Sequence, residues 1–168
     1  MIPGLNFIDL ELHEDERGWF RENYNFLKMS QEDWFEVAQS NTALNRDIGV
    51  TRGFHAEPWQ KLVTVDVGSV FGAWVDLRPE SFGQVETRII TPKLAVKIPK
   101  GVANAYQTLE ENVIYTYLVD GYWKEGIKYP SVNLEDKEIN IDWPIKEMII
   151  SAKDKTNPTL KELQCIKL

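Results

Sequence analysis

The sequence predicts an all-β fold, an antiparallel sandwich or barrel with a few short helices. Between residues 61 and 119, short runs rich in Val, Ile, Thr and aromatic residues alternate with turns that contain Gly, Pro or charged residues. Strands at such regular spacing are typical of these sheets. With 168 residues and no repeat or linker, we expect one domain over 1–168 that can bury a core. The predicted strands are V-T-V-D-V (63–67), V-F-G-A-W-V-D-L (70–77), V-E-T-R-I-I (85–90), L-A-V-K-I (94–98), A-Y-Q-T-L (105–109) and V-I-Y-T-Y-L-V (113–119).

Composition excludes several classes of protein. A net charge of −7 argues against a nucleic-acid partner, which would need a basic face. No apolar run approaches the length of a membrane span, and the N-terminus lacks the pattern of a signal peptide, so we expect no membrane partner. The single cysteine, Cys165, excludes an internal disulfide and fits a cytoplasmic location.

One helix is expected before the strands. The run S-Q-E-D-W-F-E-V (30–37) begins with Ser30, a favourable N-cap, and acidic residues follow in its first turn. After Gly121 the pattern returns to loops and a polar tail.

The first two strands can be joined as a hairpin. Gly68-Ser69 is a two-residue turn with Gly first, as a type II′ turn prefers. That turn would pair Val63 with Trp74 and Lys61 with Asp76, all on one face. A lysine opposite an aspartate at the end of an apolar face is either the floor of a pocket or a salt bridge at the rim, because burial of unpaired charge is costly.

A second hairpin is predicted around a four-residue loop, 109–112. It would place Asn104 and Tyr106 on a common face with Tyr115 and Tyr117. A shift of one residue in register would separate the first pair from the tyrosines, but Tyr115 and Tyr117 point the same way in either register.

The segment T-R-G-F-H-A-E-P-W-Q-K (51–61) is the strongest candidate for chemistry. It contains His55, one of only two histidines, whereas His13 lies among charges and resembles solvated surface. Proton transfer at a carbon next to a ketone needs a base, a cation or donor at the carbonyl oxygen, and an acid. His55, Lys61 and Tyr117 could fill these roles. The alternative is that His55 is a hydrogen-bonded structural residue and that the strand tyrosines are core residues.

Other chemistries find less support in the residues. Two distant histidines do not form a metal site, so no metal is expected. The chain has no phosphate-binding loop, no G-x-G-x-x-G and no G-x-S-x-G, and Cys165 near the C-terminus is a poor nucleophile candidate.

A series of motifs runs in order along the chain: D-E-R-G-W-F (15–20), Q-S-N-T (39–42), G-V-T-R-G-F-H (49–55), Q-K-L-V (60–63), V-D-L-R (75–78), F-G (82–83), P-K-G-V-A (99–103), I-D-W-P (141–144) and S-A-K-D (151–154). Each is weak alone, but their shared order over most of the chain resembles the dTDP-4-dehydrorhamnose 3,5-epimerase family. This family of the cupin superfamily works without a cofactor. The resemblance implies a cupin-type double-stranded β-helix, or jelly roll. It also implies a homodimer in which the subunits exchange N-terminal strands. Leu5, Phe7 and Ile8 are then the candidates for that contact.

The resemblance also implies roles for single residues. The base falls on His55, with Asp154 as the carboxylate that orients it. The acid falls on Tyr117, in Y-L-V-D-G-Y-W, and Lys61 matches the lysine near the C4 keto oxygen. The expected contacts to the nucleotide phosphates or the sugar are Arg17, Glu22, Gln39, Asn41 and Arg52, with Asp76 nearby inside the barrel.

The chain departs from the family pattern beside these residues. Asn104 stands where the family usually has a histidine; it can hydrogen-bond a sugar or phosphate but cannot titrate near neutrality. Ala56 and Glu57 replace a common aromatic and glutamine, and Glu57 adds a negative charge near the site.

The function implied by the resemblance is epimerisation of a nucleotide-linked 4-keto-6-deoxyhexose, without metal or redox cofactor. Two alternatives remain open at this point. One is a single-centre epimerase or keto-isomerase on a related nucleotide sugar. The other is a non-catalytic cupin that binds a sugar nucleotide.

Overall fold

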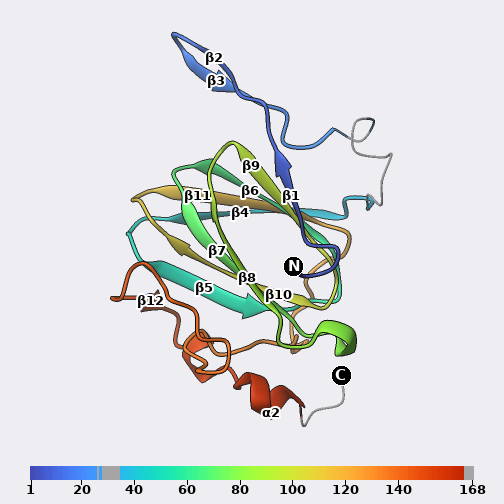
Figure 1. Cartoon of the computed structure of the whole chain (residues 1–168). Coiled ribbons are helices and arrows are strands. Elements are labelled where there is room, and N and C mark those ends of the chain that lie inside the picture. The colour runs from blue at the N-terminus through green and yellow to red at the C-terminus, as the bar shows by residue number, and fades with distance from the viewer. Residues whose placement is uncertain (26, 28–34, 165–168) are drawn as a thin grey trace.

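The fold is a sandwich of two five-stranded sheets, seen in a computed structural model that describes residues 1–25, 27 and 35–164 (Figure 1). One sheet has the order β1-β9-β6-β11-β4 and the other β12-β5-β10-β7-β8. The strands of the first sheet are β1 (Asn6–Asp9), β9 (Leu94–Ile98), β6 (Lys61–Val67), β11 (Val113–Val119) and β4 (Gln39–Asn45). Those of the second are β12 (Ile149–Ile150), β5 (Val50–His55), β10 (Val102–Thr108), β7 (Val70–Asp76) and β8 (Val85–Ile90). This arrangement confirms the predicted all-β, cupin-type fold, and the six predicted strands correspond to β6 through β11.

The main core lies between the two sheets. Val63 and Val65 of β6 face it from one sheet, and Val70 and Trp74 of β7 face it from the other. β-Branched and aromatic side chains fit the pleated inner faces of a sandwich, and their burial supplies most of the stabilisation. On β4, by contrast, partly buried and exposed residues alternate, so one face of that strand meets solvent.

The predicted hairpin between β6 and β7 is wrong. The turn lies where expected, but it carries the chain from one sheet to the other, so the strands do not pair. Lys61 lies opposite Ile98 and Val119, whereas Asp76 lies opposite Val102. Gly68 has φ +77°, and a Cβ there would come within 2.8 Å of Val113. The sequence pattern did not distinguish the two arrangements, because both direct the valines and Trp74 into one core.

The predicted pairing of β10 with β11 is also wrong, although the loop does span residues 109–112. The two strands belong to opposite sheets. Asn104 and Tyr106 of β10 therefore face Tyr115 and Tyr117 of β11 across the interior. The rings of Tyr106 and Tyr115 stack at 3.9 Å between centroids.

An N-terminal arm extends away from the sandwich. Its strands β2 (His13–Asp15) and β3 (Gly18–Phe20) form a hairpin that projects from the body (Figure 1). The buried guanidinium of Arg21 fixes the base of the arm, because it donates to the carbonyl of Val65 at 2.9 Å and pairs with Asp66. The helix expected over 30–37 lies largely outside the described residues, and positions 35–37 have no regular secondary structure. Cys165 also lies outside them.

The C-terminal segment covers the outer face of the second sheet. It includes η2 (Asp154–Thr156) and α2 (Leu160–Gln164), and η1 (Pro79–Ser81) lies earlier, after β7. Leu160 and Trp143 pack with Phe54 and Val75 in a second core. This packing brings Asp154 against the end of β5. Within the described residues, no helix is both long and apolar enough to cross a membrane.

Candidate active site

A cavity of about 180 Å³ opens between the two sheets at one end of the sandwich. Both sheets contribute side chains to it, so the fold rather than any one segment assembles the site. The lining residues are Ala43, Arg52, His55, Glu57, Lys61, Val63, Asn104, Tyr106, Tyr115 and Tyr117. Four of the predicted site residues with ionisable side chains, Arg52, His55, Lys61 and Tyr117, thus meet in one space, together with Asn104.

His55, at the end of β5, is held by Asp154. Its Nε2 lies 2.8 Å from Asp154 Oδ1, and the ring is 38% exposed. Burial raises the pKa of Asp154, but the hydrogen bond and charge of His55 and the donors of Ser151 and Gly53 outweigh burial, so the pKa lies below its ordinary value. An ionised carboxylate only accepts hydrogen bonds, so Nε2 carries the proton. In the neutral form of the imidazole, the Nδ1 lone pair is then the one left to accept a proton.

Lys61, at the start of β6, is a buried ammonium group with its side chain only 7% exposed. Its Nζ donates to Asn104 Oδ1 at 2.6 Å and forms an ion pair with Glu57. Burial lowers the pKa of Lys61 below its ordinary value, and the Glu57 carboxylate opposes that shift. The same pair keeps the pKa of Glu57 below its ordinary value in spite of burial. A third N–H of the ammonium remains for a ligand oxygen.

Three tyrosines form the opposite and inner parts of the cavity. Burial, followed by the negative charge of Glu57, raises the pKa of Tyr117. Burial raises the pKa of Tyr106 to about 12 and that of Tyr115 well above its ordinary value. All three phenols are therefore protonated near neutral pH. Tyr117, the least enclosed of them, can donate a proton or a hydrogen bond into the cavity.

Other predicted contact residues lie at the edge of the cavity. Gln39 and Asn41 are hydrogen-bonded to each other and alternate with Ala43 along β4, so all three share the face that meets the cavity. Asn41 lies directly opposite Tyr117 in the ladder between β4 and β11. Arg52 reaches the cavity from β5 and donates to Asn45 Oδ1 at 2.9 Å.

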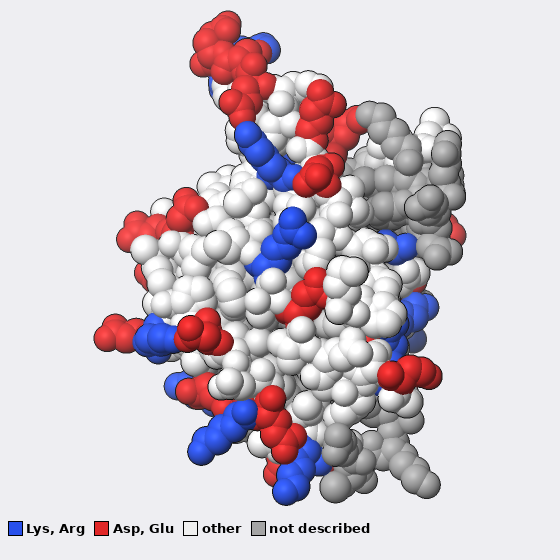
Figure 2. Space-filling model, viewed as in Figure 1, with Lys and Arg blue, Asp and Glu red and all other residues white. Residues whose placement is uncertain are grey.

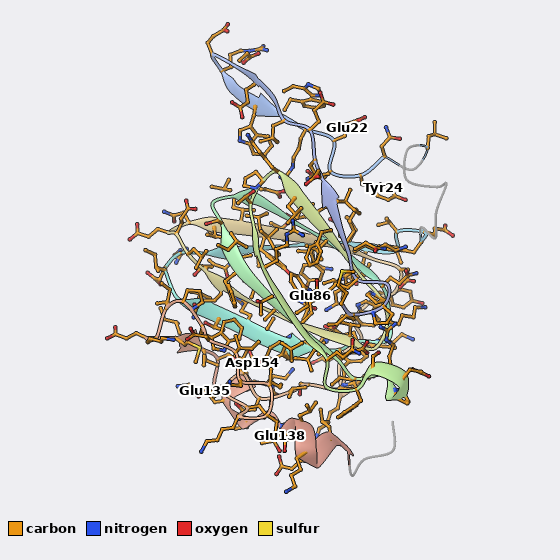
Figure 3. The ribbon with its side chains drawn as sticks, in the orientation of Figure 1. Glu22, Tyr24, Glu86, Glu135, Glu138 and Asp154 are labelled. Carbon is orange, nitrogen blue, oxygen red and sulfur yellow. The ribbon has the colours of Figure 1, made fainter. Side chains whose placement is uncertain are left out.

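Asp76, Arg17 and Glu22 neither line this cavity nor contact the described residues that do. The Asp76 carboxylate is fully buried and accepts hydrogen bonds from Arg78 and Ser81, so it has a structural environment. The hairpin that would have brought Asp76 beside Lys61 does not form, because β7 pairs with β10 and β8. Arg17 lies at the tip of the projecting hairpin, paired with Asp15, and Glu22 lies in the arm, far from Asp154 (Figure 3).

The contact between Glu57 and Lys61 was not predicted. In the sequence, Glu57 differs from the family pattern but is not a predicted site residue. In the structure its carboxylate lines the cavity and pairs with Lys61. Asn104, which also differs from the family pattern, contacts the same Nζ atom of Lys61. Glu57 and Lys61 lie four residues apart, but a loop rather than a helical turn connects them. The spacing alone therefore did not predict the contact.

Comparisons with known proteins identify the family of this chain. The model of the dTDP-4-dehydrorhamnose 3,5-epimerase family matches residues 1–162. A Streptococcus pyogenes protein named "Protein RmlC homolog" is 41% identical, with 99% of this chain and 89% of that protein covered. The Salmonella typhimurium dTDP-4-dehydrorhamnose 3,5-epimerase is 32% identical, with coverages of 96% and 93%. The structure of RmlC from Streptococcus suis in complex with dTDP-D-xylose has a TM-score of 0.91 and 39% identity, with coverages of 96% and 88%.

The fold and the matches together define a carbohydrate epimerase on a cupin-type sandwich, an enzyme of the isomerase class. The chain belongs to the dTDP-4-dehydrorhamnose 3,5-epimerase family.

Proposed function

We propose that this chain epimerises a dTDP-linked 4-keto-6-deoxyhexose at C3 and C5 by removing and returning protons next to the C4 ketone. One observation carries the proposal: His55 and Tyr117 enter the same cavity from opposite sheets. Inversion of a carbon requires a base on one side of the sugar ring and an acid on the other. The bound dTDP-D-xylose of the Streptococcus suis relative supports the choice of nucleotide.

Each step has a group suited to it. Neutral His55 takes the proton from carbon through Nδ1, and Asp154 stabilises the imidazolium that results. The electron pair moves into the C4 carbonyl, and the Lys61 ammonium stabilises the enolate oxygen. Tyr117 then donates its proton to the opposite face of the carbon. In this proposal, Arg52, Gln39, Asn41 and Asn104 hold the sugar or its diphosphate.

Deuterium uptake from solvent tests this function. The purified protein is incubated in D₂O with dTDP-4-keto-6-deoxyglucose, and exchange is followed at C3 and C5. Uptake at both carbons with inversion supports a 3,5-epimerase. Uptake at one carbon supports the single-centre epimerase, and none at either supports a sugar-nucleotide-binding protein instead.

Tyr117→Phe is expected to separate the two halves of the reaction. Without the phenol, His55 still removes the proton and exchanges it with solvent, but the opposite face lacks an acid. We therefore expect label to enter at carbon while net inversion falls by about a hundredfold or more. Comparing exchange with inversion by NMR is the measurement, and Tyr122→Phe, at an exposed position, is the matched control. Equal loss of exchange and inversion would instead place Tyr117 in substrate binding.

We also propose that the protein acts in the cytoplasm as a homodimer. The support for the dimer is the projecting arm, in which Trp19 and Phe20 are exposed although they are large and apolar. Leu5, Phe7 and Ile8, the residues expected at this contact, pack instead against this chain's own core clusters. Acidic side chains gather at the tip beyond them (Figure 2). A second copy that covered Trp19 and Phe20 could also receive Arg17 and Glu22 at its own site. These two predicted contacts would then be made between subunits.

Phe20→Glu tests the dimer. A carboxylate in place of this apolar ring is expected to weaken association by about tenfold or more, because its burial would be unpaired. Sedimentation velocity over a concentration series measures the change. Phe20→Leu, which keeps the position apolar, should remain associated. A wild-type protein that sediments as a monomer at all concentrations would contradict the proposal.

A further inference from the structure

Lys61, the cation of the chemistry proposed above, is paired with Glu57, to which that chemistry gives no role. Lys61 is almost completely enclosed, and Glu57 is largely so. Among the described residues that line the cavity, Glu57 is the only one with a carboxylate. The single negative charge of the cavity therefore lies directly against its buried ammonium group.

The other groups that face this cavity cannot replace Glu57. β5 contributes Arg52 and His55, which are cationic or neutral, and β4 contributes Ala43. β10 and β11 contribute phenols whose pKa values are raised, so they are uncharged near neutrality. Asn104 offers Lys61 a carbonyl oxygen but no charge. An enclosed ammonium without an opposite charge tends to lose its proton, and neutral Lys61 would stabilise an enolate poorly.

Glu57 and Asn104 also restrict where the ammonium points. Both contact Nζ, one by an ion pair and the other by a 2.6 Å hydrogen bond. The ring of Tyr117 lies 5.9 Å from the same atom. These contacts hold Nζ at the wall of the cavity that Lys61 lines.

We propose that Glu57 is a positioning residue for Lys61: its carboxylate keeps the ammonium charged and oriented beside Asn104, ready for the oxygen of a bound ketone. The proposal deepens the function proposed above and rests on it for the role of Lys61. Glu57 itself acts through Lys61 and transfers no proton to the sugar.

The protonation of Lys61 can be measured directly, without substrate. The ¹³Cε shift of Lys61, identified by its loss in Lys61→Met, is followed against pH in wild type and in Glu57→Gln. Removal of the negative charge at nearly constant volume should move the midpoint to lower pH. Glu125→Gln, at an exposed site, is the matched control and should leave the midpoint in place. An unmoved midpoint in Glu57→Gln would overturn the proposal.

A variant that moves the negative charge to the other side of Nζ tests whether the charge itself, rather than a structural change at position 57, shifts the midpoint. In Glu57→Gln with Asn104→Asp, the carboxylate returns to Nζ from the other side, where Asn104 Oδ1 lies now. The midpoint should move back toward that of wild type. A midpoint that stays low in the double variant would mean that the charge beside Nζ is not what matters, and the proposal would fail. Thermal unfolding of each variant shows whether it is folded.

Activity provides the second measurement. In Glu57→Gln, deuterium exchange at neutral pH should fall by roughly tenfold to a hundredfold, and the alkaline limb of its pH profile should move to lower pH. Glu57→Asp should keep most of the exchange. If wild type shows no exchange, the proposed function fails, while the titration still tests the effect of Glu57 on Lys61. If the midpoint moves and exchange does not change, Glu57 has no positioning role in catalysis.

Discussion

His55→Ala is expected to reduce deuterium exchange at C3 and C5 by about a thousandfold or more, while binding of dTDP changes little. Among the described residues that line the cavity, His55 is the only histidine, the residue type whose free side chain exchanges protons near neutral pH, so no neighbour there can replace it as the base. The ring is 38% exposed and belongs to the cavity rather than to the core, so the fold should tolerate its removal. Exchange is measured by NMR, and nucleotide binding by calorimetry.

His55→Asn is the matched variant for this prediction. Its amide can still donate a hydrogen bond toward Asp154, so the local contacts of the aspartate are better preserved, but it cannot take a proton near neutrality. Both variants should therefore be inactive. Exchange retained in His55→Asn would mean that the imidazole orients the substrate and that another group is the base.

Much of the fold could be predicted from the sequence because local patterns determine strands. The runs from 63 to 119 combine β-branched residues with turn residues, and the strands β6 to β11 lie where those runs do. Strand pairing is a different problem. The turn at Gly68-Ser69 looks like a hairpin turn, yet it connects two sheets, and both arrangements bury Val63, Val65 and Trp74. Only the long-range contacts with β9, β10 and β11 decide between them.

The candidate site, like the fold, was predicted in part from the sequence. His55, Lys61 and Tyr117 were placed by motif and by chemistry, and the two sheets bring them to one cavity. Asp76 was expected beside Lys61 both from the resemblance and from a pairing of β6 with β7, and that pairing does not form. Arg17 and Glu22 match family residues but lie in the projecting arm. The sequence of one chain does not reveal where that arm lies relative to a second copy. Glu57 was found only when the fold placed its carboxylate against Lys61.

Lys61→Met is expected to have the second large effect, and it affects stability as well as activity. The change removes the cation at the ketone oxygen, which should lower exchange by about a hundredfold to a thousandfold. It also leaves the enclosed Glu57 carboxylate without its partner. Breaking a buried ion pair from one side costs about 3–5 kcal/mol, so the free energy of unfolding should fall by an amount of that order.

The double variant Lys61→Met with Glu57→Gln separates these two effects. Because both charges are gone, no unpaired ion remains buried, and most of the lost unfolding free energy should return. Exchange should stay as low as in Lys61→Met, since the cation at the ketone is still missing. Chemical denaturation measures the stability, and Lys146→Met, which breaks an exposed pair with Asp142, is the control that should cost little. If the double variant recovered exchange together with stability, then Lys61 would matter to folding alone, and the enolate would have to be stabilised by another donor, such as Asn104 or Arg52.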